Sequence, residues 1–231
     1  MSAHGLFVTG TDTGVGKTLI ACGLTRALAA RGLKVAVLKP VASGSLRTSD
    51  GLRNEDALSL LACANIGQTY DEVNRYCFEP AISPHIAADE AGISINTDLI
   101  AADFRNLGPR ADWVVAEGAG GWLAPIGPDE TMADLAAALA APVLLVVGLR
   151  LGCLNHAALT LKAIRARGLV FAGWIASAVD PNLARARENL ITLTRSLGEP
   201  PLEIVPHRPA QAPALLLTAA AARLAALSLS T

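Results

Sequence analysis

The residues with the clearest chemical meaning form one glycine-rich segment, Thr9-Gly10-Thr11-Asp12-Thr13-Gly14-Val15-Gly16-Lys17-Thr18. It follows an apolar run at residues 6–8 and precedes a helical pattern. Small residues let backbone N–H groups converge on phosphate oxygens, and the N-terminus of a helix favours an anion. Lys17 can bridge the outer phosphates, and the Thr18 hydroxyl can bind Mg²⁺. The segment is therefore predicted to bind phosphate, although five residues rather than four separate its first glycine from Gly-Lys-Thr.

Three further charged residues follow predicted strands or open a helix, where they can reach the same ligand. Glu117 ends an apolar run and precedes Gly118-Ala119-Gly120, as expected for an acid beside a metal on phosphates. Lys39 follows the run at residues 34–38, and a second lysine suits phosphoryl transfer, which spreads negative charge over oxygens. Asp56 lies in the first turn of a predicted helix, where an acid contributes about 0.5 kcal/mol without any metal.

A fourth segment, Gly152-Cys153-Leu154-Asn155, follows the predicted strand at residues 143–147 and opens a helix. Free N–H groups at such a start can hold a carboxylate. A simple cap by Asn155 explains the same residues, and the spacing does not separate the two interpretations.

Short apolar strands alternate with amphipathic helices along the chain. Strands are predicted at residues 6–9, 34–38, 113–116, 143–147, 170–176 and 203–205, and helices at 16–31, 54–64, 96–107, 131–140, 155–167, 182–197 and 212–227. Asn54, Asn155 and Asn182 are expected N-caps. Near-continuous apolar strands are typical of a parallel sheet covered on both faces. We expect a single α/β domain over residues 1–231, a P-loop NTPase-like three-layer fold with a mostly parallel sheet between helices.

Composition excludes several functional classes. Hydrophobic residues make up 52% and charged residues 17% of the chain, so it is a globular protein. The net charge is −1 and no Lys/Arg block stands out, so no nucleic-acid partner is expected. Pro142 interrupts the uncharged run at residues 135–149, and no signal-type start is present, so we expect no membrane partner and a cytoplasmic location. The four widely spaced cysteines are expected to be reduced thiols.

Taken together, these segments resemble the dethiobiotin synthetases of biotin biosynthesis, over nearly the whole chain. The similarity is carried by Thr9–Thr18, Lys39–Gly44, Arg53–Asp56, Ser83–His85, Glu117–Gly121 and Leu151–His156. The resemblance implies a homodimer that joins 7,8-diaminononanoate, CO₂ (or bicarbonate) and ATP into a cyclic urea, releasing ADP and phosphate. It also implies a carbamate, then a carbamic-phosphoric anhydride, with Mg²⁺ as cofactor.

Site roles follow from the resemblance position by position. Lys39 and Lys17 are expected to be catalytic, because they would stabilise the transferring phosphoryl group. Thr18, Asp56 and Glu117 are expected to hold Mg²⁺. Thr13 and Ser43 would touch the carbamate end of the substrate, and Gly152, Cys153, Leu154 and Asn155 its distal carboxylate, across the dimer interface. The nucleotide would contact Thr13, Gly14, Val15, Gly16, Lys17, Thr18, Leu19, Asp56, Glu117, Gly118, Ala119, Gly120, Ser177, Ala178, Pro206, His207 and Arg208.

The chain departs from the better-known pattern of that family in two places. Gly14 stands where some members carry Glu, and Ser177-Ala178 stands where some carry Asn-Asp, whose Asn helps to recognise adenine. We therefore expect other nucleoside triphosphates, such as CTP, to be accepted more readily than by an Asn-bearing relative.

An alternative class is the P-loop switch ATPases of the partition or division-site type. Their phosphate loop is similar but carries an extra lysine near its start. Asp12 occupies the corresponding place here, which counts against that class.

Overall fold

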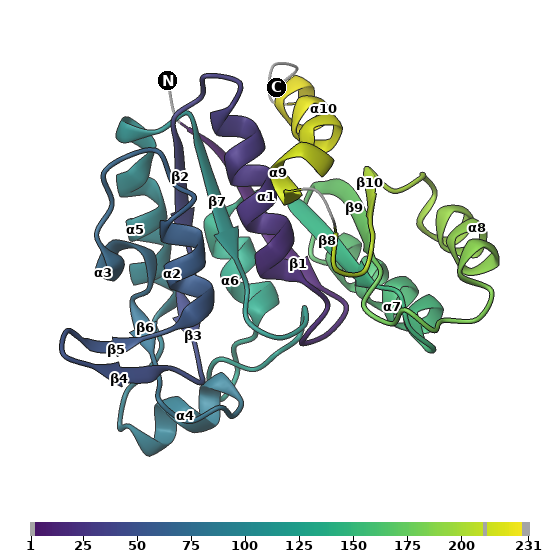
Figure 1. The fold of residues 1–231 in the computed structure, drawn as a ribbon. Helices are drawn as coiled ribbons and strands as arrows, with labels where there is room; N and C mark the ends of the chain where they lie inside the picture. Colours follow the sequence, from purple (N-terminus) through teal and green to yellow (C-terminus); the bar gives the residue numbers. More distant parts are fainter. Residues whose placement is uncertain (1–2, 210–211, 228–231) are drawn as a thin grey trace.

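The computed structural model describes residues 3–209 and 212–227. Its central element is a six-stranded sheet in the order β10-β9-β8-β1-β7-β2, and every pairing in it is parallel (Figure 1). The strands are β1 (His4–Gly10), β2 (Val35–Leu38), β7 (Trp113–Glu117), β8 (Val143–Gly148), β9 (Phe171–Ser177) and β10 (Glu203–Val205). All six strands match the predicted ones, and the mostly parallel α/β sheet is confirmed.

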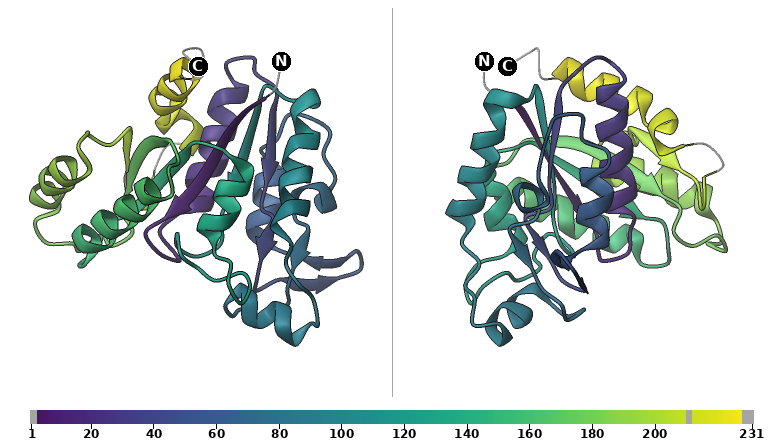
Figure 2. Two further views of the ribbon diagram at one scale, coloured as in Figure 1. Left: turned by 180° about the vertical axis from the view of Figure 1, so that it is seen from behind. Right: turned by 60° about the vertical axis from the view of Figure 1, so that its left-hand side comes forward.

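Helices cover both faces of the sheet because neighbouring strand residues point to opposite sides. Leu6 and Val8 belong to one apolar core, and Phe7, between them, belongs to the other. The first core packs against α1 (Lys17–Ala29), α2 (Glu55–Leu61) and α10 (Thr218–Leu227). The second core packs against α4 (Pro84–Glu90), α5 (Thr97–Leu107), α6 (Met132–Leu139), α7 (Cys153–Ala166) and α8 (Ala186–Leu197). Figure 2 shows the two helical layers from behind and from the side.

β1 lies at the point where the chain changes direction across the sheet. The strands that follow it, β2 and β7, lie on one side, and β8, β9 and β10 lie on the other. In open parallel sheets such a switch point opens a crevice at the carboxyl ends of the strands, and ligands bind there. The glycine-rich loop after β1 therefore stands at the favoured place for a ligand.

Several short elements were not predicted. They are α3 (Tyr70–Val73), α4, the 3₁₀ turn Gly108–Arg110, α9 (Pro213–Leu216), the pair β3 (Val41–Ala42) and β6 (Tyr76–Cys77), and the hairpin β4 (Leu46–Thr48) with β5 (Gly51–Arg53). Most are too short for a hydrophobic period to be read from the sequence. All of them except α9 lie between β2 and β7 in the sequence, and β3, β4, β5, β6 and α4 form the lower left part of Figure 1.

Of the three predicted N-caps one is confirmed and two are wrong, and one predicted helix is divided in two. Asn54 does cap α2, since its side chain accepts a hydrogen bond from the N–H of Ala57. Asn155 does not cap α7, which begins at Cys153 after Gly152, whose φ of 96° suits glycine. Asn182 lies in a turn, its N–H bonded to Asp180, and α8 begins only at Ala186. The predicted helix at residues 212–227 is divided into α9 and α10.

Two predictions about the whole chain concern its location and its thiols. None of the described helices is both long and apolar enough to cross a membrane. The four cysteines are free thiols, two of them buried.

Candidate active site

The loop between β1 and α1 has the backbone that a phosphate ligand needs. Gly16 caps α1 with a φ of 91°, and Gly14 also lies in the left-handed region. A Cβ on Gly10 would lie 2.6 Å from Val15, so only glycine fits where the chain leaves the strand. The glycines therefore let the loop turn tightly and leave the helix N-terminus open toward an anion.

Asp12 anchors this loop from within. Its carboxylate accepts a hydrogen bond of 2.7 Å from the N–H of Thr13 and forms an ion pair with Arg150, which follows β8. Its carbonyl accepts a hydrogen bond of 3.0 Å from Lys17 Nζ. Switch ATPases carry their extra lysine at the position of Asp12. In this chain Asp12 instead links the loop to the segment that follows β8.

Lys17 is the first residue of α1 and is 7% exposed. Burial and the nearby Lys39 ammonium lower the pKa of Lys17 to about 8, against the attraction of Glu117, Asp56 and Asp12. The residue thus sits where a negative ligand would relieve an unfavourable environment.

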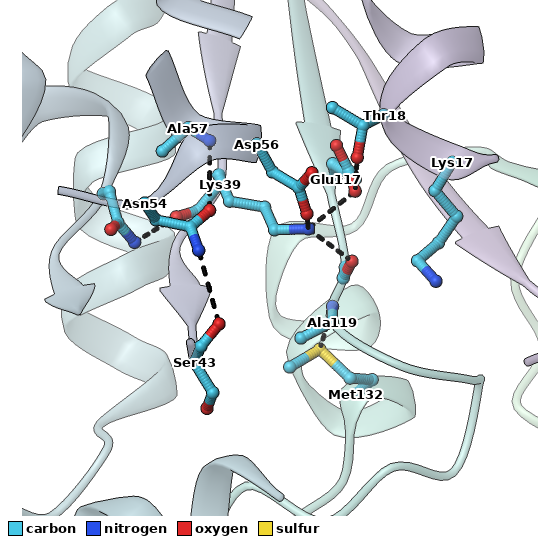
Figure 3. Close-up of polar contacts among 12 residues, drawn as sticks. Lys17, Thr18, Lys39, Ser43, Asn54, Asp56, Ala57, Glu117, Ala119 and Met132 are labelled. Atoms are coloured by element: carbon cyan, nitrogen blue, oxygen red, sulfur yellow. Dashed lines mark hydrogen bonds and ion pairs between the residues drawn. The ribbon is translucent and has the colours of Figure 1, made fainter. Parts of the chain in front are cut away.

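Lys39 and Glu117 come together through the register of the sheet. Leu38, the last residue of β2, pairs with Ala116 of β7, so Lys39 and Glu117, which follow them in the chain, lie next to each other. Lys39 Nζ donates a hydrogen bond of 2.6 Å to Glu117 Oε1, and both side chains are 5% exposed or less. Thr18 donates to the same oxygen at 2.9 Å. Figure 3 shows this cluster.

Asp56 completes the cluster from α2. Its Oδ2 lies 3.2 Å from Lys39 Nζ, and its side chain is 46% exposed. Burial disfavours charge on both groups and is the largest single effect, but the attractions of the neighbouring opposite charges together outweigh it. The pKa of Lys39 is therefore raised, with Glu117 contributing most, and the pKa of Asp56 is lowered. Lys39 is an ammonium held between two carboxylates.

The donor set fits a magnesium ion bound together with phosphates. Glu117 Oε2 is buried and has no hydrogen-bond partner among the described residues. The Thr18 hydroxyl contacts the other oxygen of Glu117, and Asp56 shares Lys39 Nζ with Glu117 as an ion-pair partner. The described residues contain no group of three or more His, Cys, Asp or Glu suited to a metal, so phosphate or water would have to complete the coordination. Mg²⁺ characteristically binds in this way.

These residues line one cavity of about 840 Å³ at the carboxyl ends of β1, β2 and β7. Of the expected site residues it brings together Thr13, Gly14, Gly16, Lys17, Thr18, Lys39, Ser43, Asp56, Glu117, Ala119 and Gly120. Ser43 Oγ is buried there and has no hydrogen-bond partner among the described residues. A hydroxyl left open inside a polar cavity is a natural contact for a ligand.

The cavity also has lining residues that the sequence analysis did not predict to contact a ligand. They are Asp12, Ala42, Asn54, Ala81, Ile82, Ser83, Pro84, Gly121 and Ala124. Ser83 Oγ lies 2.9 Å from His85 Nδ1. The segment Ser83–His85 was noticed only as part of the family resemblance, and the short helix α4 that carries it was not predicted.

Other expected residues lie outside the cavity lining. Val15 is fully buried, and neither Leu19 nor Gly118 lines the cavity. Gly152, the N-cap of α7, and Cys153, Leu154 and Asn155 in its first turn are not among the residues that line the cavity.

A second group of expected nucleotide contacts lies at the ends of β9 and β10, outside the cavity lining. A Cβ on Gly16 would lie 2.9 Å from Ser177 Oγ, so the end of β9 touches the phosphate loop. Ala178 donates its N–H to Val205, and its carbonyl lies 3.2 Å from His207 Nδ1. Pro206 and Arg208 flank that histidine in the sequence. The ends of β9 and β10 therefore form one surface next to the loop.

Comparison with known proteins agrees with this architecture. A family model described as an AAA domain matches residues 4–214. Among solved structures, the MinD cell division protein of Aquifex aeolicus matches with a TM-score of 0.61 and 17% identity, covering 97% of this chain and 98% of that one. A ParA family ATPase from Chlorobium tepidum matches with a TM-score of 0.57 and 14% identity, covering 94% and 98%. These structures share the P-loop fold.

Sequence relatives are much more similar. The ATP-dependent dethiobiotin synthetase BioD of Pseudomonas paraeruginosa is 50% identical over 202 residues, 87% of this chain and 89% of the relative. That of Cellvibrio japonicus is 47% identical over 207 residues, 90% and 91% of the two chains. With this identity over nearly the full length, and with a phosphate loop, two lysines and two acids in one cavity, the chain belongs to the family of ATP-dependent dethiobiotin synthetases.

Proposed function

We propose that this protein is an ATP- and Mg²⁺-dependent cyclo-ligase that converts 7,8-diaminononanoate and CO₂ into dethiobiotin, with release of ADP and phosphate. The observation that carries the proposal is the cavity in which Lys17 of the phosphate loop, Lys39 and Glu117 converge. Membership of the family supplies the substrate. The alternative of a switch ATPase shares only the fold, at 14–18% identity.

The proposed reaction has three steps. One amine of the substrate adds to CO₂ and loses a proton, which gives a carbamate. A carbamate oxygen attacks the γ-phosphorus, and ADP leaves with the electron pair of the broken P–O bond. The second amine then attacks the carbonyl carbon of the mixed anhydride and loses a proton, and phosphate leaves as the urea ring closes.

The side chains of the cavity serve this reaction through charge and position. Lys39 is an ammonium at neutral pH, because its carboxylate neighbours raise its pKa, and this is the form that stabilises a transferring phosphoryl group. Lys17 supplies a second cation from the start of α1. Thr18, Asp56 and Glu117 would hold Mg²⁺, which neutralises phosphate charge when it is bound. No side chain has to form a covalent intermediate.

The substrate would lie across the mouth of the loop. Thr13 and the open hydroxyl of Ser43 would contact the carbamate end. The residues that open α7 lie outside this cavity, which supports a site completed by a second subunit. There the N-terminus of α7, at Gly152–Asn155, would bind the distal carboxylate, with its N–H groups and helix dipole favouring the anion. The homodimer, and a cytoplasmic location, stay predictions.

The nucleotide base would lie beside the ends of β9 and β10. Ser177 directs its hydroxyl at Gly16, and the backbone groups of Ala178 contact Val205 and His207. Neither side chain offers an amide to an adenine edge. We therefore expect kcat/KM for CTP to approach that for ATP; a strong preference for ATP would contradict this.

A coupled assay for phosphate release tests the proposed function. Phosphate release should require both diaminononanoate and bicarbonate, and one dethiobiotin should appear for each phosphate. Release of phosphate that is independent of both compounds would reject the assignment and favour a switch ATPase. Recruitment to lipid vesicles or polymerisation with ATP would then be the next measurement.

A further inference from the structure

The peptide of Lys39 is held by the short helix α3 and the residue after it. β2 ends at Leu38, so Lys39 lies just beyond the sheet. Its N–H donates a hydrogen bond of 2.8 Å to the carbonyl of Val73, and its carbonyl accepts one of 2.7 Å from Asn74 Nδ2. Asn74 is 3% exposed. A four-residue helix thus determines where the backbone of Lys39 lies.

Tyr70, the first residue of α3, connects this contact to the helix that carries Asp56. Its hydroxyl donates a hydrogen bond of 2.9 Å to Asn74 Oδ1 and accepts one of 2.7 Å from the N–H of Asn54. Burial, followed by contact with Cys77, raises the pKa of Tyr70 above its ordinary value, so the hydroxyl keeps its proton. The guanidinium of Arg53 lies 4.2 Å above the centre of the tyrosine ring.

Asn54 links Tyr70 to the helix that carries Asp56. Its Oδ1 accepts a hydrogen bond of 3.2 Å from the N–H of Ala57 and so caps α2. Asp56 lies in the first turn of that helix and pairs with Lys39 Nζ at 3.2 Å. The contacts therefore form a closed ring, which leads from the Lys39 carbonyl through Asn74, Tyr70, Asn54 and Asp56 to the ammonium of the same lysine.

The ring of hydrogen bonds can restrict the positions of two charged side chains, Lys39 and Asp56, that are otherwise mobile. A lysine side chain is long and flexible. Asp56 is 46% exposed and stands on a helix of only seven residues. Outer partners that orient such groups are commonly as important as the groups themselves. The hydroxyl of Tyr70 joins the two backbones from which the charges project.

We propose that Tyr70 is a positioning residue whose hydroxyl sets the separation of Lys39 and Asp56, and thereby the strength with which the site binds nucleotide together with Mg²⁺. This inference rests on the proposed roles of those two residues. It makes no use of the diamine substrate, so it can be tested separately from the overall reaction.

The chain contains a matched control for this residue. Its only other tyrosine, Tyr76, also accepts a hydrogen bond from the backbone N–H of a helix-capping asparagine, Asn96, at 3.1 Å. That asparagine caps α5, which contributes no residue to the cavity. Tyr70→Phe and Tyr76→Phe therefore remove the same atom from the same kind of contact, one inside the ring and one outside it.

The experiment measures ADP affinity by calorimetry, with Mg²⁺ and with EDTA, for the full-length chain and both variants. Mg²⁺ is expected to increase the affinity for ADP, and in Tyr70→Phe this increase should be about tenfold smaller than in the unaltered chain. The affinity of Tyr70→Phe for ADP in EDTA should stay unchanged. Tyr76→Phe should match the unaltered chain in both conditions. Asn74→Ala breaks the ring at its next contact and should repeat the Tyr70→Phe pattern.

Three results would overturn the proposal: an unchanged Mg²⁺ gain in Tyr70→Phe, an equal fall in Tyr76→Phe, or an equal loss with EDTA and with Mg²⁺. The last would indicate a general structural role. Failure of the proposed function would show itself differently, as phosphate release by the unaltered chain that does not require diaminononanoate and bicarbonate.

Discussion

Lys17 and Lys39 line the same cavity in opposite electrostatic surroundings. Both are largely buried. Lys39 touches two carboxylates, which outweigh the cost of burying its charge and raise its pKa. Lys17 has a carbonyl as its hydrogen-bond acceptor and Lys39 as a neighbour, so its pKa is lowered to about 8. One lysine keeps its proton at any physiological pH, and the other holds it weakly until an anion arrives.

We therefore expect nucleotide binding to be coupled to proton uptake above the pKa of Lys17. At about pH 8.5 the empty site is partly deprotonated at Lys17, and bound phosphates would raise its pKa, so ADP should bring in a proton. Below that pKa the lysine is already charged and uptake should vanish. Calorimetry in two buffers of different ionisation enthalpy measures this quantity. Lys17→Arg, whose guanidinium stays charged, should show no uptake at either pH.

Lys39→Gln should abolish most turnover while the fold survives. Gln can still donate a hydrogen bond to Glu117, but it brings no positive charge to the phosphoryl group. Loss of one preorganised group of this kind lowers kcat by about 100- to 1,000-fold. Dethiobiotin formation gives kcat, and far-UV circular dichroism checks the fold. A kcat near that of the unaltered chain would show that Lys39 has no catalytic role.

Among the elements, the start of α1 depends on the end of β9. Gly16 combines a φ of 91° with a close neighbour, because a Cβ there would meet Ser177 Oγ at 2.9 Å. Gly14 has a φ of 70° but would meet nothing within 4 Å. A side chain at Gly14 would therefore meet only the cost of a left-handed backbone. A side chain at Gly16 would meet that cost and a steric contact with β9 as well.

Gly14→Ala should lower the free energy of unfolding by about 1–2 kcal/mol, the cost of a left-handed alanine. Gly16→Ala should cost more, because its methyl group also displaces Ser177. Adding Ser177→Ala to Gly16→Ala removes the hydroxyl and leaves the next atom at 3.9 Å, so part of the loss should return. Urea unfolding of the four proteins measures these differences. Equal losses for the two single glycine variants would contradict the role of β9.

For the molecule as a whole, the cavity draws its lining from one half of the chain. Every described residue in its lining lies between Asp12 and Ala124. The later half provides the surface at the ends of β9 and β10, and the start of α7. Residues 152–155 at the start of α7 are not among the residues that line the cavity, and in the proposed homodimer a second chain would bring them to the substrate.

Mixed dimers test this arrangement. Asn155→Asp places a negative charge in the first turn of α7, which suits the helix but repels a bound carboxylate, so KM for diaminononanoate should rise strongly. A dimer of Lys39→Gln with Asn155→Asp keeps one site with both residues intact. At a diaminononanoate concentration far below the KM of Asn155→Asp, neither variant should turn over alone, and random reassociation of the two should restore about a quarter of the unaltered activity. No recovery, in mixtures shown to exchange subunits, would place the carboxylate site within one chain.

Local patterns in the sequence were sufficient to predict the central sheet and the phosphate-binding loop of this protein. The apolar runs predicted all six strands of the sheet, because a strand buried on both faces needs little else. The glycines around Lys17 and the acid after residues 113–116 indicated a phosphate site, because their chemistry lies in adjacent residues. Asn54 was recognised as a cap for the same reason.

Tertiary structure alone decided how the distant charges are combined. The register of β2 and β7 puts Lys39 beside Glu117, although the two residues are 78 positions apart. Tyr70 begins α3 and Ser83 caps α4, and both helices are too short to show a hydrophobic period in the sequence. Nevertheless, α3 holds the backbone of Lys39, and Ser83 lines the cavity. Contacts between remote segments depend on packing and register, and neither is encoded in any single stretch of residues.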